Sequence, residues 1–467
     1  MIFVLGALLI LMALLGTPLF VVLAGLALVS FVMADTNIIV LSEEHYKLAT
    51  NPHLLTIPMF TLAGFLMAES KAAERLVRVS RALLGGAPGG LAIVVVASCA
   101  FFTTFTGASG VTIIALGGLL YPILLEERYP EDFSLGLITA SGSIGLLFPP
   151  SLPIILYGIV AGASIDDLFI AGIFPGAVMM GVLALYCVWV GLRREPDMME
   201  GIKGSWKELV GTLLLFPLFL IYKLATDREV RASIWEAKWE LAVPVVVVGA
   251  IYGLPDFMEP WVGAGGVAGL VTIAEASVVC AAYLLIIEVF VFKDISLFDA
   301  PEGDGRSSLS SVIRESMVMV GAILIILGAA LGLTNYLIQE EVPMQLLAFI
   351  QEHIESRTTF LFMLTIFLLI VGCLMDIFSA ILVVVPLITP IAAQYGVDPI
   401  HLGIIFLANL EIGYITPPVG LNLFISSLAF DKPVVKLYRM AIPFLILLLM
   451  ALMLITFYPP LSLWFMD

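Results

Sequence analysis

Charged residues are scarce in this chain of 467 residues, at 12% of the total, whereas 61% are hydrophobic. A typical soluble domain has about 25% charged residues, so this composition excludes that class. Several apolar runs exceed the roughly 20 residues that a helix needs to cross a bilayer. Runs such as 1–34 and 269–292 are nearly continuous rather than alternating, which favours helices over an outer-membrane barrel. The sequence therefore predicts an all-α polytopic membrane protein.

Cysteine and histidine are also rare, with four of each. The cysteines lie inside apolar segments without metal-ligand spacing and are predicted to be small core residues. The histidines fall in or beside predicted loops, where solvated or interfacial positions are expected. The sequence has neither the GK[ST] ending of a phosphate-binding loop nor a nucleophile beside its base at membrane depth. We therefore expect a chain that is not an enzyme and that has no cofactor.

The sequence contains an internal repeat. At an offset of 268 residues Pro122 aligns with Pro390, and the double proline of GLLFPPSLP (from Gly145) aligns with that of GYITPPVGL (from Gly413). Chance would give roughly one proline coincidence at a given offset, so a two-fold repeat is predicted. Five pieces recur at this offset: 4–30 with 269–294, 48–70 with 316–338, 89–125 with 357–393, 133–164 with 401–431, and 168–192 with 436–460.

The third piece of each half is too long for one helix. It has about 37 residues, with TGASG or MDIFSA at its middle, and this pattern predicts a re-entrant hairpin. The chain then divides into a first membrane repeat at 1–193, a connecting insert with one helix at 194–264, and a second, inverted repeat at 265–467.

The basic residues predict the orientation. Residues 1–34 have no charge and lack the basic start of a cleaved signal peptide, so a retained spanning helix is expected. A cytoplasmic N-terminus places 19 of the 21 lysines and arginines inside, with Lys47 and Arg357 outside. One crossing at 241–253 inverts the second half and leaves the C-terminus outside. The apolar run 209–224 is expected to lie on the cytoplasmic interface or to re-enter.

The two double prolines break helices at membrane depth. A proline inside a helix costs about 3 kcal/mol or more, and the freed carbonyl groups need partners in lipid. Two broken helices and two hairpins in inverted halves are the usual construction of a secondary transporter, where bared carbonyls bind cations and helix N-termini face anions. The breaks are therefore predicted to form ion and substrate sites.

Neutral oxygens near the breaks suit sodium. The candidates for site one are Gly107, Ser109, Ser141, Ser143, Pro149 and Pro150, and those for site two are Asp376, Ser379, Asn409, Thr416, Pro417 and Pro418. Glu411 is a further candidate, because a carboxylate inside an apolar segment is costly and therefore functional by default. For each single residue the alternative is close helix packing or a structural hydrogen bond.

At this point the sequence resembles a known family, the large membrane subunit (DctM-type permease) of tripartite ATP-independent periplasmic (TRAP) transporters. The resemblance rests on IPMFTLAGFLM from Ile57, FTGASGVTIIALGGLLYPIL from Phe105, SGSIGLLFPPSLPIILYGIVAGASI from Ser141, LFIAGIFPG from Leu168 and NLEIGYITPPVGLNLF from Asn409. The chain departs from the family at Val111, followed by Thr112, where a second serine is common. The segment 209–235 also looks inserted.

This resemblance implies a function. The family's members are elevator-type transporters of the bacterial inner membrane that couple sodium to the uptake of an organic acid. They work with a small four-helix membrane subunit (DctQ-type) and receive substrate from a soluble periplasmic binding protein. The alternative is a single-component sodium/organic-anion symporter of similar architecture, which needs no binding protein.

Overall fold

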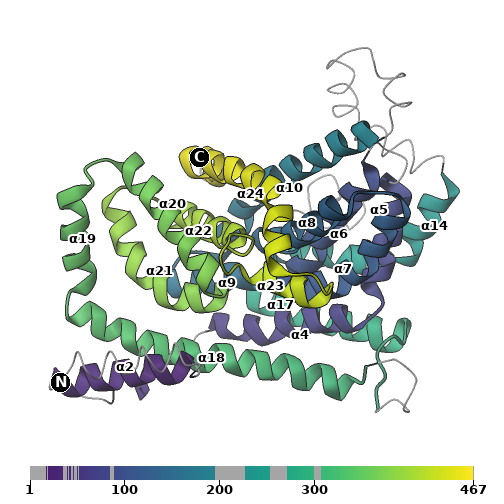
Figure 1. Cartoon of the computed structure of the whole chain (residues 1–467). Helices are drawn as coiled ribbons and strands as arrows, with labels where there is room; N and C mark the ends of the chain where they lie inside the picture. The colour runs from purple at the N-terminus through teal and green to yellow at the C-terminus, as the bar shows by residue number, and fades with distance from the viewer. Residues whose placement is uncertain are drawn as a thin grey trace.

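The computed structural model describes residues 19–34, 52–84, 89–194, 227–252, 271–298 and 307–465, with a few single positions before residue 52. Over these ranges the chain is helical (Figure 1), and apart from one isolated bridge between Ser296 and Ser308 the described ranges contain no strand. The predicted all-α class is confirmed.

The helices of the first half follow the predicted pieces. They are α2 (Leu19–Met33), α4 (Thr56–Glu69), α5 (Ala72–Leu84), α6 (Gly90–Thr106), α7 (Ser109–Glu126), α8 (Glu131–Ser141), α9 (Leu152–Ala161) and α10 (Ile165–Arg194), with 3-10 turns η1 (Pro52–Leu55) and η2 (Ile144–Leu147). Between the halves the described residues form α14 (Arg228–Glu236) and α15 (Lys238–Tyr252). The predicted interfacial run 209–224 and the first 16 residues lie outside the described residues.

The second half repeats this order. Its helices are α17 (Ile273–Leu285) with its π-helical end η4 (Ile286–Val291), α18 (Leu309–Gln339), α19 (Val342–His353), α20 (Arg357–Leu374), α21 (Ile377–Gln394), α22 (Pro399–Gly413), α23 (Leu421–Ala429), α24 (Val434–Phe457) and α25 (Pro460–Leu463). α7 and α21 begin 268 residues apart, and so do α8 and α22. The Pro149–Pro150 and Pro417–Pro418 bonds are both cis. The structure therefore contains the repeat that the prolines predicted.

In each half the described residues include a helix directly before the hairpin that the five predicted pieces do not contain. α5 precedes the first hairpin (α6 and α7), and α19 precedes the second (α20 and α21). α5 is amphipathic: Leu76 and Val77 are buried, whereas Arg78 and Arg81 are exposed. A short helix with one charged face lies along a surface rather than across an apolar layer.

The helices form two groups (Figure 1). The long helix α18 packs along α2 and α4, and α4 also packs against α17; we call these four helices the scaffold. The hairpins and broken helices lie together above it in this view, in contact with α10 and α24. α10 and α24 pack directly on the broken helices: α24 contacts α8 and α22, and α10 contacts α22.

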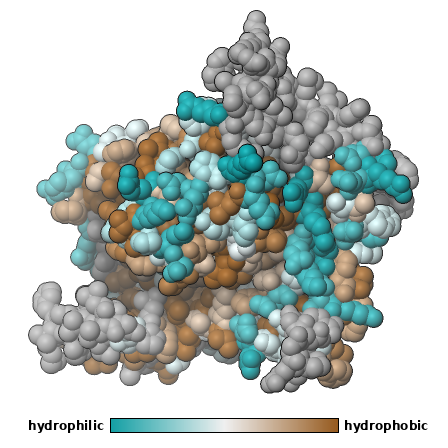
Figure 2. All heavy atoms as spheres, turned by 45° about the vertical axis from the view of Figure 1, so that its right-hand side comes forward, coloured by the Kyte–Doolittle hydropathy of each residue, from teal (hydrophilic) through white to brown (hydrophobic). Residues whose placement is uncertain are grey.

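Within the described ranges seven helices are long and apolar enough to cross a membrane, or eight if the bent pair 131–147 and 152–161, with an angle of 47° between its parts, is one span. Large apolar side chains of these helices are exposed, including Val318 in α18 and Ile370 in α20. Apolar residues also cover much of the face in Figure 2. Such extensive exposed apolar surface is typical of a chain surrounded by lipid.

A buried ion-pair cluster fixes α5. The guanidinium of Arg75 donates to Glu240 in α15, to Glu288 in η4 at 3.0 Å and to Asp294 at 2.6 Å. It also stacks on the Phe292 ring at 3.8 Å from the centroid. The Arg75 side chain is therefore buried where the first half meets the second half and the connecting helix α15.

Candidate functional site

The tip of the first hairpin lies against the first helix break. Gly107 ends α6 with φ +62°, and its N–H donates to the Thr103 carbonyl oxygen at 2.8 Å. A Cβ added at Gly107 would come within 3.0 Å of the Leu152 Cβ, at the start of α9. Ser109, the first residue of α7, is buried. The tip is thus enclosed by protein, as a re-entrant hairpin requires.

Two threonines of α6 hold the first broken segment. Thr103 donates to the Gly142 carbonyl oxygen at 2.8 Å, and Thr104 donates to that of Gly145 at 3.1 Å. Thr103 also shares a hydrogen bond of 2.7 Å with Thr112, the residue after the family's expected serine position. Threonine hydroxyls therefore satisfy two of the carbonyls that the break exposes. The sequence prediction missed Thr103 and Thr104.

The second hairpin has a different tip. Asp376 is exposed and caps α21, because its carboxylate accepts hydrogen bonds from the Ser379 N–H at 3.0 Å and from the Ser379 hydroxyl. The Tyr414 hydroxyl accepts from the Ile377 N–H at 2.5 Å, and the Gly420 N–H donates to the Cys373 carbonyl oxygen at 3.1 Å. These contacts join the second tip to the second break.

Close backbone approach brings hairpin and break together in both halves. A Cβ at Gly145 would lie 2.1 Å from the Ala100 carbonyl oxygen, and one at Gly413 would lie 2.6 Å from the Gly372 carbonyl carbon. Gly145 and Gly413 are equivalent in the repeat. Both glycines therefore admit the first arm of their hairpin at a distance that no side chain permits.

Ser141 and Asn409 are also equivalent positions of the repeat, and both are fully buried. The Ser141 hydroxyl has no hydrogen-bond partner, and neither has the Asn409 side-chain oxygen, whose amide donates to Ile405 at 2.7 Å. Buried polar atoms without a partner are rare and call for an explanation, such as a bound ion. Both are predicted site residues.

Glu411 is the most isolated carboxylate among the described residues near the breaks. It is 1% exposed, and neither of its oxygens has a hydrogen-bond partner of good geometry, although the backbone of Leu147 lies near. Its own carbonyl oxygen accepts a hydrogen bond from Ser143 at 3.3 Å. A site-one candidate thus touches the helix of site two.

The other predicted residues have ordinary local roles. Thr416 donates to the carbonyl oxygen of Ile412, four residues earlier in the chain, at 2.8 Å. Pro149, Pro150, Pro417 and Pro418 form the two breaks. Ser151 was missed; it occupies the N-cap position of α9 without a capping hydrogen bond, and its buried hydroxyl also lacks a partner. Its position directly after the double proline is the sequence feature that could have identified it as a candidate.

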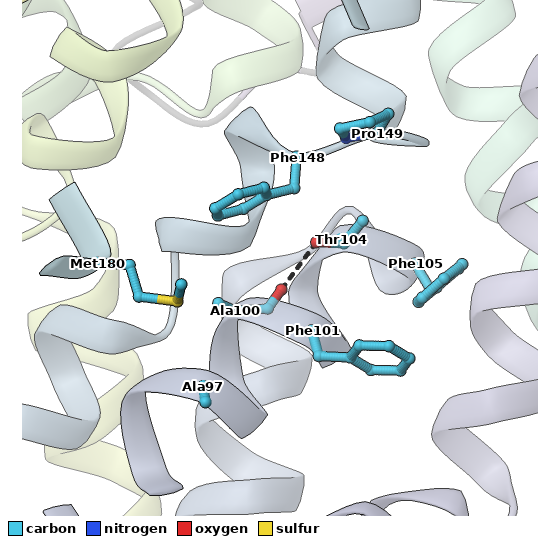
Figure 3. Close-up of a pocket in the computed structure, with 8 residues that line it drawn as sticks. All are labelled: Ala97, Ala100, Phe101, Thr104, Phe105, Phe148, Pro149 and Met180. Atoms are coloured by element: carbon cyan, nitrogen blue, oxygen red, sulfur yellow. Dashed lines mark hydrogen bonds between the residues drawn. The ribbon is translucent and has the colours of Figure 1, made fainter. Parts of the chain in front are cut away.

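A cavity of about 300 Å³ lies beside the first break (Figure 3). It is lined by Ala97, Ala100, Phe101, Thr104, Phe105, Phe148, Pro149 and Met180. The Thr104 hydroxyl is its one polar side-chain group, and that hydroxyl already donates to the Ala100 and Gly145 carbonyl oxygens. The lining of the cavity is therefore almost entirely apolar, and we do not place the site there.

The donor set of the breaks favours a monovalent cation over a transition metal. Within the described ranges no group of three or more His, Cys, Asp or Glu side chains could hold a metal ion. The unpartnered atoms at Ser141, Asn409 and Ser151 are neutral oxygens, which hard cations accept as ligands.

These features define a class of protein. A multi-pass helical chain whose two halves each bring a hairpin tip to a broken helix has the construction of a secondary transporter. The chain belongs to the family of the DctM component of tripartite ATP-independent periplasmic transporters, whose profile matches residues 5–461. It is therefore a transport permease and not an enzyme, and its apolar helices are consistent with a bacterial inner membrane.

Its curated relatives are TRAP permeases. The chain is 32% identical over 415 residues to the isethionate TRAP transporter permease protein DctMQ of Oleidesulfovibrio alaskensis, covering 88% of this chain but only 58% of that protein. It is 32% identical to the C4-dicarboxylate TRAP transporter large permease protein DctM of Pseudomonas aeruginosa, covering 90% of this chain and 86% of the relative. It is 29% identical to the ectoine TRAP transporter large permease protein TeaC of Halomonas elongata, covering 97% and 96%.

A solved structure has a similar fold. The YdaH transporter of Alcanivorax borkumensis matches with a TM-score of 0.51 at 13% identity, covering 91% of this chain and 87% of that chain. At this identity the likeness concerns the fold alone.

Proposed function

We propose that this chain is the large permease subunit that imports an organic acid anion under a sodium gradient. Relatives named for C4-dicarboxylate, ectoine and isethionate transport support this substrate class. The substrate is delivered by a soluble periplasmic binding protein, and a small four-helix membrane subunit completes the complex. Membership of the TRAP family supports both partners.

The observation that carries sodium coupling is the pair of unpartnered oxygens at Ser141 and Asn409. They occupy equivalent positions next to equivalent helix breaks. A buried hydroxyl or amide oxygen without a partner costs about 1–3 kcal/mol, which a bound cation offsets. One sodium ion in each half accounts for both atoms.

The anion is held without a basic side chain. Arg75 is the buried arginine of the described ranges, and three carboxylates already engage it. Helix N-termini after the breaks, backbone amides and the bound sodium ions supply the positive potential instead.

Transport uses an elevator movement. The bundle of hairpins and broken helices moves against the scaffold of α2, α4, α17 and α18 after sodium has ordered the hairpin tips. The N-terminus is cytoplasmic and the C-terminus periplasmic, which gives the two halves opposite orientations and suits alternating access.

Uptake into proteoliposomes tests this function. This chain and its small partner are reconstituted, and uptake of labelled organic acids is measured under an inward sodium gradient, with and without the binding protein. Uptake that needs both sodium and the binding protein supports the proposal. Sodium-driven uptake without the binding protein favours the single-component symporter, and uptake indifferent to sodium contradicts the coupling.

A further inference from the structure

Helices α8 and α23, which belong to different halves, form a polar interface. At one end Lys432 donates to Glu131 at 2.6 Å, and this hydrogen bond raises the pKa of the lysine ammonium. Deeper along the interface the Thr139 hydroxyl donates to Ser426 at 2.8 Å. Beyond that pair lies Asn422, the second residue of α23, which is fully buried.

Asn422 joins the two helix breaks directly. Its amide nitrogen donates to the Ser143 hydroxyl at 3.4 Å and to the Thr139 carbonyl oxygen at 3.3 Å. The Ser143 hydroxyl in turn donates to the Glu411 carbonyl oxygen at 3.3 Å. A hydroxyl has one hydrogen and two lone pairs, so this pair of contacts fixes the direction of the Ser143 hydrogen and leaves one lone pair for a ligand.

The same residue also reaches the second hairpin. The Asn422 N–H donates to the Tyr414 carbonyl oxygen at 3.0 Å. The Tyr414 hydroxyl accepts from the Ile377 N–H, the first amide after Asp376. A chain of contacts therefore runs from the second hairpin tip through the hydroxyl and carbonyl groups of Tyr414 and the N–H and side chain of Asn422 to the first break. Hydrogen-bond networks of this kind can transmit coupling between sites.

The equivalent positions of the first half do not repeat this connection. The residue equivalent to Asn422 in the first half is Ile154, and the one equivalent to Tyr414 is Leu146. Neither aliphatic side chain can form the corresponding hydrogen bonds. The repeat alone therefore does not account for Asn422 and Tyr414.

We propose that Asn422 is a positioning residue that couples the two predicted sodium sites, so that sodium in one site raises the affinity of the other. The proposal rests on the proposed function. Ordering the second tip fixes Tyr414, which fixes Asn422 and so sets the Ser143 hydroxyl for the first site. Because such coupling is reciprocal, sodium in the first site also favours the ordered second tip.

The test measures how steeply wild type and Asn422→Ala depend on sodium in the reconstituted complex. Two readouts are compared: the initial rate of uptake, and the rise in Tm of the purified complex with sodium concentration. Two coupled sites allow a Hill coefficient of up to about 2 in wild type. Asn422→Ala is expected to lower it to about 1 in both readouts.

Two further variants guard against a folding defect. Tyr414→Phe breaks the same chain at its other end and is expected to lower the Hill coefficient equally. Ser426→Ala removes the hydrogen bond to the Thr139 hydroxyl in the same interface but leaves the bonds of Asn422 to Ser143 and Tyr414 in place, and is expected to keep the wild-type value. A loss of cooperativity in Ser426→Ala as well overturns the proposal in favour of general packing.

The remaining outcomes separate the two proposals. A wild-type complex whose uptake and Tm ignore sodium overturns both. A sodium-dependent wild type with a Hill coefficient of 1, or an unchanged coefficient in Asn422→Ala and Tyr414→Phe, overturns the coupling alone.

Discussion

The Ser143 hydroxyl donates a hydrogen bond of 3.3 Å to the carbonyl oxygen of Glu411, and these two residues are 268 positions apart. Equivalent residues of a repeat meet in this way only near the axis that relates the two halves. The helix breaks therefore face each other across the axis, and the two predicted sites share a boundary. The two predicted sites are therefore not structurally independent of each other.

The first prediction concerns the tip of the first hairpin. Gly107→Ala introduces a Cβ at φ +62° and 3.0 Å from Leu152. The left-handed conformation alone costs a non-glycine residue about 1–2 kcal/mol, and crowding adds to this. We expect a lower Tm of the purified complex together with reduced uptake.

Gly162→Ala is the matched control for that variant. Gly162 also ends a helix with a positive φ, +66°, but nothing lies within 4 Å of an added Cβ. Gly162→Ala should lower the Tm because of its left-handed conformation, but it should leave uptake unchanged. Equal losses in both variants would mean that the tip contact with Leu152 is unimportant.

The second prediction concerns the close contacts of hairpin and break. Gly145→Ala and Gly413→Ala each place a Cβ against backbone, at 2.1 Å and 2.6 Å. Backbone cannot yield as a flexible side chain does, so both variants are expected to reduce the amount of folded protein and its uptake. Fluorescence-detected size exclusion in detergent measures the first quantity.

Gly181→Ala in α10 is the control, because an added Cβ there meets nothing within 4 Å. Alanine is favoured over glycine inside a helix by about 0.5–1 kcal/mol, so this variant should be neutral or slightly stabilised. Wild-type behaviour of Gly145→Ala or Gly413→Ala would contradict the packing argument.

The sequence predicted the order of helices because its strongest features are physical necessities. Long apolar runs must be helical in lipid, and a double proline inside such a run interrupts the helix. It did not predict α5 and α19, because short helices along a surface lack a long apolar run. It also placed His401 in a loop region, whereas the structure buries it in α22, 3.3 Å from the Thr456 carbonyl oxygen.

The site was predictable in outline and not in detail. The breaks, the hairpins and the buried oxygens of Ser141 and Asn409 follow from spacing within one repeat. Contacts between the two halves cannot be predicted from that spacing. The hydrogen bond between Asn422 and Ser143, for example, joins residues that are 279 positions apart in the sequence. The position of Asp376 directly before a helix could have predicted its capping role, in addition to the ion-binding role that we predicted.

The third prediction separates these two roles of Asp376. Asp376→Asn keeps a side-chain oxygen that can cap α21 but removes the charge, whereas Asp376→Ala removes both. If Asp376 binds sodium, both variants raise the sodium concentration for half-maximal uptake, as does Ser109→Ala. The loss of the cap should lower the Tm of the alanine variant alone, by the equivalent of about 1 kcal/mol. Unchanged sodium dependence in Asp376→Ala and Ser109→Ala would remove both residues from the sodium sites.

The fourth prediction concerns the ion-pair cluster that holds α5. Arg75→Ala leaves the buried carboxylates of Glu240 and Glu288 without their cation, and breaking a buried pair on one side costs about 3–5 kcal/mol. Arg78→Ala, one turn along the same helix, loses only an exposed pair with Glu236 at 3.7 Å, which is worth at most about 1 kcal/mol. Thermal unfolding of the purified complex should therefore show a large fall in Tm for Arg75→Ala and almost none for Arg78→Ala. Similar small effects would indicate that water or a bound proton already neutralises the carboxylates. Because α5 precedes the first hairpin, a folded but transport-deficient Arg75→Ala would indicate that the cluster matters for transport beyond its effect on stability.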